Sequence, residues 1–124
     1  MLEEEMLANK VWAVIGANQN PEKYGNMIYH KLKRKGYEVY AVNPRYGEID
    51  GDVCYASLAG LPRRPEVINM VVAPEIGASF LREAAALGIR NVWFQPGTHD
   101  ESTAALVQQL GLTAVYACVL VATR

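Results

Sequence analysis

The segment Val11–Gly25, VWAVIGANQNPEKYG, limits the possible folds of this chain more than any other part of it. The run Val11–Ile15 is entirely apolar, which is typical of a parallel strand covered on both faces. The strand ends at Gly16, and a small polar loop leads into a predicted helix. In α/β proteins this arrangement holds the phosphates of a nucleotide, because glycine lets the backbone approach the ligand and the helix start presents unpaired N–H groups. The glycine spacing departs from GxGxxG, which bears on the choice of ligand.

Strand patterns alternate with helical patterns along the rest of the chain. Strands are predicted at Val11–Ile15, Tyr37–Val42, Val53–Tyr55, Val67–Val72, Asn91–Phe94 and Ala114–Val119. Helices are predicted at Asn26–Arg34, at Glu75–Leu87, and from a capping box at Thr98 and Glu101 to Leu110, with Gly36, Gly88 and Gly111 ending them. We expect Leu2–Ala8 to form a short helix or a frayed leader, and Ser57–Leu61 to form one helical turn.

This alternation predicts a Rossmann-like, doubly wound parallel sheet between two layers of helices, an α/β/α single domain over residues 1–124. Numbered along the chain, its strands are expected in the order 3-2-1-4-5-6. Ligands of such sheets bind at the carboxyl ends of the strands, where the order reverses. The loops predicted to meet there are Gly16-Ala17-Asn18, Asn43-Pro44-Arg45, Val72-Ala73-Pro74 and Gln95-Pro96-Gly97. Lys23, Tyr24 and Gly25, at the start of the first long helix, complete the candidate site.

Composition argues against several classes of protein. A formal net charge of −1 provides no overall basic field for nucleic acid, so any anion site must be built locally. Cys54 and Cys118 have neither CxxC nor zinc spacing, and we expect two buried free thiols, with Cys118 in the core of the last strand. The acidic start is unlike a secretion signal, and no apolar run reaches the roughly 20 residues that cross a bilayer. We therefore expect a soluble cytoplasmic protein that contacts neither membrane nor nucleic acid.

No catalytic or metal-binding residues are predicted. The sequence offers no convincing Ser–His–Asp set and no pair of carboxylates with a clear geometry. His99 is expected near a helix start, where the helix dipole favours the uncharged imidazole, and His30 is expected at the surface of a helix. Trp12 and Trp93 are expected to pack against covering helices.

The end of the second strand bears on the kind of nucleotide. An NAD site usually has Asp or Glu there to bind the ribose hydroxyls, whereas this chain has Asn43-Pro44-Arg45. The Arg45 guanidinium is a planar fork suited to a phosphate, such as the 2′-phosphate of NADP or the ribose phosphate of coenzyme A. The residues alone leave both ligands open.

Five segments, in order along nearly the whole chain, carry a family resemblance: VIGANQNPEKYG, GYEVYAVNPR, CYASLAGLP, VWFQPG and GLTAVYACV. Together they resemble the stand-alone coenzyme A-binding domain family, whose fold is similar to that of the N-terminal domain of the succinyl-CoA synthetase α subunit. The resemblance implies binding of coenzyme A or an acyl-CoA along the strand ends, and no particular reaction. The ligase subunit depends on a phosphohistidine in a second domain, so we expect no ligase chemistry here.

The resemblance also implies a role for each loop. Gly16, Ala17 and Asn18 would line the diphosphate with backbone groups, and Tyr24 and Gly25 would close the loop onto the helix. From its residue type alone, Tyr24 is expected to pack against the protein and not to stack on the ligand. Asn43, Pro44 and Arg45 would flank the adenosine or its ribose phosphate. Val72, Ala73 and Pro74 would run beside the pantetheine or adenine, and Gln95, Pro96 and Gly97 would border the far end. Many relatives carry basic residues just before the proline of the third of these loops. This chain has Val72-Ala73 there and lacks that phosphate partner.

Three functions follow from these observations. The first, which we prefer, is a module that binds coenzyme A or an acyl-CoA without chemistry of its own, because no evident nucleophile or base accompanies the loops. The second is an NAD(P)-binding domain or enzyme fragment, for which 124 residues leave little room for a substrate region. The third is an interaction protein that has kept the fold and lost the ligand. A homodimer or another protein partner stays open in each case.

Overall fold

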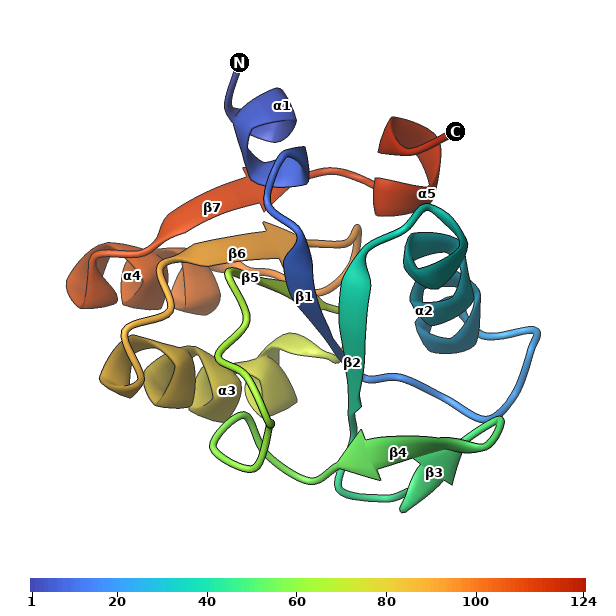
Figure 1. Ribbon diagram of the computed structural model, residues 1–124. Coiled ribbons are helices and arrows are strands. Elements are labelled where there is room, and N and C mark those ends of the chain that lie inside the picture. Colours follow the sequence, from blue (N-terminus) through green and yellow to red (C-terminus); the bar gives the residue numbers. More distant parts are fainter.

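The computed structural model describes all 124 residues and shows one mostly parallel sheet with helices on both faces (Figure 1). Its seven strands are β1 (Val11–Ile15), β2 (Glu38–Val42), β3 (Glu48–Ile49), β4 (Asp52–Tyr55), β5 (Val67–Met70), β6 (Asn91–Phe94) and β7 (Thr113–Tyr116). They lie in the order β3-β4-β2-β1-β5-β6-β7, which confirms the predicted order of the parallel strands. The short strand β3 was not predicted; it pairs antiparallel with β4 at the sheet edge.

The side chains of β1 alternate between two hydrophobic cores. Trp12 and Val14 belong to the core under α1 (Leu2–Leu7), α2 (Tyr24–Arg34) and α5 (Val119–Ala122). Ala13 and Ile15 belong to the core under α3 (Pro74–Ala86) and α4 (Glu101–Leu110). Because successive side chains of a strand point to opposite faces, a central strand between two cores must be apolar throughout. Trp12 and Trp93 are fully buried, as predicted, with ring centroids 5.9 Å apart.

Two strands end earlier than predicted. β5 ends at Met70 instead of Val72, and β7 ends at Tyr116 instead of Val119. The last pair in the ladder between β6 and β7 is Phe94 with Tyr116, so β7 has no neighbour to pair with beyond that point. The prediction that Cys118 lies in the core of the last strand is therefore wrong, and this residue is the partly exposed N-cap of α5.

The helix boundaries agree only in part with those that the sequence pattern predicts. α2 begins at Tyr24, two residues before the predicted start. The capping box of α4 is formed by Asp100 and Thr103, with both reciprocal N···O distances at 2.9 Å, and not by Thr98 and Glu101. The segment 57–61 forms bends and a turn in place of the predicted helical turn. Leu2–Leu7 is helical, and glycines follow α2, α3 and α4 as predicted.

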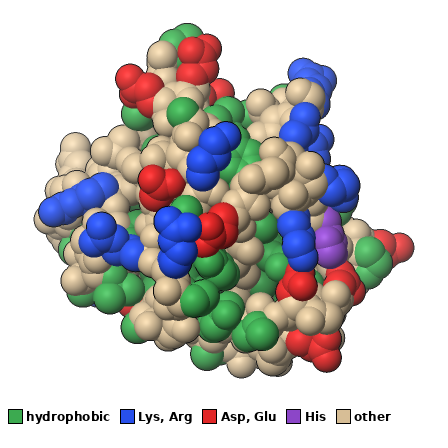
Figure 2. All heavy atoms as spheres, viewed as in Figure 1, with side chains coloured by type: hydrophobic (Ala, Val, Ile, Leu, Met, Phe, Trp, Pro, Cys, Tyr) green, Lys and Arg blue, Asp and Glu red, His purple; other side chains and the backbone are tan.

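The β3–β4 hairpin is joined to α2 by polar contacts, away from the carboxyl edge. His30 contacts Asp50 at 2.6 Å, and the Tyr29 hydroxyl donates to Asp52 at 2.8 Å. Lys33 forms an ion pair with the same Asp52 carboxylate. Figure 2 shows basic and acidic side chains and a histidine meeting in this region. None of the helices combines the length and the apolar character that crossing a membrane requires.

Candidate functional site

Two adjoining cavities open at the carboxyl edge of the sheet. The larger cavity, of about 510 Å³, is bordered by the start of α2, the loop after β6 and Cys118, and we call it the β6-side cavity. The smaller cavity, of about 320 Å³, is bordered by the loop after β2 and the first turns of α3, and we call it the β2-side cavity. The residues that line both are Gly16, Asn18, Val71, Val72 and Ala73. The two cavities therefore form one groove with its middle at the end of β1.

Two glycines create the middle of the groove. Gly16 has φ +102°, and a Cβ there would lie 2.9 Å from Val72 and 3.0 Å from the Val71 carbonyl. A Cβ on Gly25 would lie 2.0 Å from the Gly16 carbonyl oxygen, so only glycine allows α2 to approach the strand end this closely. The wide spacing of the two glycines, unlike that in GxGxxG, accommodates the longer polar loop between them.

Unpaired backbone donors surround this point. The N–H groups of Asn18, Tyr24 and Gly25 donate to no acceptor in the protein, and all three residues line the β6-side cavity. The loop is held by side chains, because Asn18 Oδ1 accepts from the Asn20 N–H at 2.8 Å and Asn20 Oδ1 accepts from the Glu22 N–H at 2.9 Å. α2 adds the positive end of its dipole. This arrangement favours a bound anion.

The charges in the groove are positive. Neither cavity is lined by an aspartate or a glutamate. Lys23 lines the β6-side cavity and Arg45 the β2-side cavity, and neither side chain has an ion-pair or hydrogen-bond partner. Because the net charge of the chain is −1, an anion site has to be built from local charges, and the groove provides such charges.

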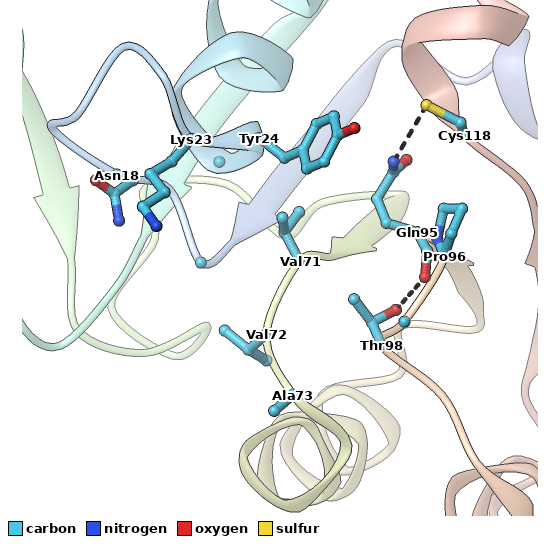
Figure 3. Close-up of a pocket in the computed structure, with 13 residues that line it drawn as sticks. Asn18, Lys23, Tyr24, Val71, Val72, Ala73, Gln95, Pro96, Thr98 and Cys118 are labelled. Carbon is cyan, nitrogen blue, oxygen red and sulfur yellow. Dashed lines mark hydrogen bonds between the residues drawn. The ribbon is translucent and has the colours of Figure 1, made fainter.

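The wall of the β6-side cavity carries a thiol beside a buried amide, across the cavity from Lys23 and Asn18 (Figure 3). Gln95 is 4% exposed, and its Oε1 accepts from the Val119 N–H at 2.8 Å while its Nε2 donates to Cys118 Sγ at 3.5 Å. Burial acts to raise the pKa of the Cys118 thiol, but hydrogen bonds from Gln95 and from the backbone of Val121 and Leu120 outweigh it and lower that pKa.

Nearly all residues of the predicted site line the groove, and the exceptions are Ala17 and Pro74. Ala17 is fully buried in the core, and its carbonyl accepts from the Asn43 amide at 2.9 Å. Pro74 is the first residue of α3. The Asn43 side chain joins two loops, because its amide N–H donates to the Ala17 carbonyl and its Oδ1 accepts from the Arg45 N–H. Tyr24 is 60% exposed, so its prediction as a packing residue is wrong.

Sequence reasoning missed several residues of the groove. In the β6-side cavity these are Val71, Thr98 and Cys118, and in the β2-side cavity Val42, Ile76 and Phe80. Cys118 was assigned to a strand because VYACV reads as an unbroken apolar run. Val71, Thr98 and Val42 directly adjoin predicted site residues, and extending each loop by one residue would have included them.

Comparisons with known proteins agree with one another. A protein-family model described as "CoA binding domain" matches residues 10–124. The chain is 40% identical over 73 residues to the ADP-forming acetate–CoA ligase I of Archaeoglobus fulgidus. The matched residues make up 59% of this chain and 11% of that ligase. A conserved hypothetical protein from Pyrococcus furiosus matches in structure with a TM-score of 0.85 and 40% identity, over 92% of this chain and 99% of that one. A hypothetical protein from Pyrococcus horikoshii matches with a TM-score of 0.87 and 32% identity, over 94% of this chain and 82% of that one.

Proposed function

The chain belongs to the CoA binding domain family, and from that premise we propose that it binds coenzyme A or an acyl-CoA in the groove at the carboxyl edge of its sheet. We propose further that this binding is not catalytic. The observation that carries the proposal is the cluster of unpaired N–H groups at Asn18, Tyr24 and Gly25, in a groove without acidic side chains.

The diphosphate is assigned to the middle of the groove. Its oxygens are hydrogen-bond acceptors, and the free N–H groups there, with the positive end of α2, are matched to them. Because Gly16 and Asn18 line both cavities, a diphosphate beside them leaves one cavity for each end of an extended ligand. Coenzyme A has this form, with a nucleotide at one end and pantetheine at the other.

The adenosine is assigned to the β2-side cavity. Ile76 and Phe80 give this cavity an apolar wall, and Arg45 places an unpaired guanidinium at its rim. A ribose phosphate beside Arg45 would form a charge-assisted hydrogen bond. Pantetheine then enters the β6-side cavity. Lys23 supplies a cation to the same cavity, whose lining at Val72 and Ala73 is uncharged.

Calorimetric titration with coenzyme A, dephospho-CoA and NADP⁺ tests the binding. We expect saturable heat with coenzyme A, weaker binding of dephospho-CoA because it lacks the ribose phosphate, and no comparable binding of NADP⁺. Absence of heat with millimolar coenzyme A would refute the proposal and favour an interaction protein without a ligand. Tighter binding of NADP⁺ than of coenzyme A would favour the dinucleotide alternative.

The lining of the groove supports the non-catalytic part of the proposal. Neither cavity is lined by a histidine, an aspartate or a glutamate, the side chains that act most often as general acids and bases in enzymes. Incubation with acetyl-CoA, followed by a thiol-specific dye, should release no more coenzyme A than buffer alone. Continuous release over many turnovers would contradict a purely binding role.

A further inference from the structure

We propose that this groove also captures the oxidised form of its ligand, with Cys118 exchanging with coenzyme A disulfide and keeping one coenzyme A as a mixed disulfide. The inference rests on the proposed function, because it requires pantetheine to lie in the β6-side cavity. The product is a stoichiometric, reversible adduct, so no catalytic turnover is implied.

The position of Cys118 is the first observation behind this proposal. Cys118 lines the β6-side cavity and not the β2-side cavity, and Figure 3 shows it across from Asn18, Val72 and Ala73, which line both. Coenzyme A carries its sulfur at the end of pantetheine, away from the nucleotide. A ligand held at the middle of the groove by its diphosphate therefore directs its sulfur toward the wall that contains Cys118.

A buried amide in the same wall is a second, independent observation that points to a ligand. Gln95 is 4% exposed and lines the cavity, and its Oε1 is occupied by the Val119 N–H. A primary amide has two N–H donors. One donates to Cys118 Sγ, and the other has no partner in the protein. A buried donor without a partner is costly, so the cavity is suited to a guest that brings an acceptor, such as an amide carbonyl of pantetheine.

The surroundings of Cys118 also favour its reactive form. The thiolate is the nucleophile in disulfide exchange, and the hydrogen bonds from Gln95 and the backbone lower the pKa of this thiol despite its burial. Lys23 is the charged side chain that lines the same cavity, and no carboxylate faces the thiol from the other residues of the lining.

The exchange balances without any further reagent. The Cys118 thiolate attacks one sulfur of coenzyme A disulfide, the bond between the two coenzyme A sulfurs breaks, and a bond between Cys118 and the attacked coenzyme A forms. The second coenzyme A leaves as a thiolate and takes up the proton that Cys118 has released. One disulfide replaces another, so nothing else is oxidised or reduced. The step needs no general base, which fits a cavity without histidine or carboxylate.

Cys54 provides an internal control. It is 7% exposed in the core, lines neither cavity, and burial raises the pKa of its thiol. A thiol in this environment is expected to be inert toward the same reagent. The two cysteines of the chain thus differ in access and in ionisation, and Cys54→Ser and Cys118→Ser are matched variants.

The experiment mixes the reduced protein with coenzyme A disulfide and follows the intact mass over time. We expect one coenzyme A per chain, located at Cys118 by peptide mapping, removed by dithiothreitol, retained in Cys54→Ser and absent from Cys118→Ser. The rate should saturate with reagent concentration and exceed that with oxidised glutathione about tenfold or more, because binding of the nucleotide positions the disulfide.

Calorimetry of the reduced wild-type protein with coenzyme A separates this inference from the proposed function. If the wild-type protein binds coenzyme A but forms no adduct with coenzyme A disulfide, the exchange is refuted and the binding stands. If the wild-type protein does not bind coenzyme A, the proposed function fails. Equal rates with coenzyme A disulfide and oxidised glutathione, without saturation, would overturn the inference, because the cysteine would then react without help from the groove.

Discussion

The two ends of the groove use the same sheet edge in different ways. At the β6 side, Gln95 is buried and joins the end of β6 to the start of α5, so the thiol beside it is held by the fold. At the β2 side, Arg45 is exposed, and only its backbone is held, through its N–H bond to Asn43 Oδ1 at 2.9 Å. One end of the groove therefore offers a thiol and an amide in fixed positions, and the other offers an exposed charge without a partner, on either side of Gly16.

This difference comes from the bonds that the side chains of each loop make. Both strands have parallel neighbours on both sides, β5 and β7 for β6, and β1 and β4 for β2. Gln95, directly after β6, bonds through its side chain to the start of α5, whereas the Arg45 side chain, in the loop after β2, has no hydrogen-bond or ion-pair partner. The predictions below test this contrast, from the largest effect to the smallest.

Replacing Gly25 with alanine should abolish both ends of the groove. The new Cβ would lie 2.0 Å from the Gly16 carbonyl oxygen, so α2 must move away from the strand end. We expect a loss of about 3 kcal/mol in the free energy of unfolding, as for overpacking against backbone, together with loss of coenzyme A binding. Urea unfolding and calorimetry measure the two effects.

Gly47→Ala is the matched control, because a Cβ at Gly47 meets nothing within 4 Å. Its stability should stay within about 0.5 kcal/mol of the wild type. A Gly25→Ala variant as stable as this control, with binding intact, would show that the close approach of α2 does not shape the groove.

Replacing Gln95 with leucine should affect the β6 side alone. The change removes the acceptor for the Val119 N–H and should cost about 1–2 kcal/mol of stability. It also removes a hydrogen bond that lowers the pKa of Cys118, so the thiolate should appear at higher pH than in the wild type. The pH profile of thiol alkylation, read at Cys118 by mass spectrometry, should shift upward.

The control for this prediction is the other cysteine. The profile at Cys54 should not move, because Gln95 does not contact that residue. An unchanged profile at Cys118 would mean that its ionisation is governed by the backbone of α5 and not by the amide.

Replacing Arg45 with alanine should affect the β2 side alone. Loss of a charge-assisted hydrogen bond is expected to weaken coenzyme A binding by about 1–2 kcal/mol and to leave dephospho-CoA nearly unchanged. Lys23→Ala, across the groove near the diphosphate, should weaken both ligands by the same smaller amount. Titration of both variants with both ligands forms a complete cycle. Equal losses of affinity for the two ligands in Arg45→Ala would show that Arg45 does not contact the ribose phosphate.

The smallest effect is expected away from both ends, at the hairpin. Lys33 and the Tyr29 hydroxyl lower the pKa of Asp52 in the folded protein. A lowered carboxyl pKa contributes stability that is present above the unfolded value, near pH 4, and is lost as pH falls below it. Because the Asp52 side chain is 36% exposed, Asp52→Asn should cost about 0.5 kcal/mol at pH 7, and the difference from the wild type should disappear near pH 2.

Coenzyme A affinity should not change in Asp52→Asn, since this residue lines neither cavity. Thermal unfolding at several pH values, with and without ligand, measures both quantities. A lower affinity in this variant would show that the hairpin and the groove are coupled.

Most of the fold could be predicted from local patterns. The apolar run of β1 and the alternation of strands with helices were sufficient for the strand order, because a strand between two cores must be apolar on both faces. The antiparallel β3 was missed because Glu48–Ile49 is too short to carry a strand pattern. The start of α4 was misplaced because Thr98 resembles a cap, whereas its hydroxyl donates to the Gln95 carbonyl at 2.6 Å.

The sequence by itself determined the sheet, its order and the presence of small residues at the end of each central strand, because apolar periodicity and glycine act within a few neighbouring residues. Only the tertiary structure decided where β7 stops, and therefore that Cys118 leaves the core and lines a cavity beside Gln95. The physical reason is that a strand continues only while a neighbouring strand is present to pair with it. The end of β7 is therefore set by the end of β6, which lies more than 20 residues earlier in the chain.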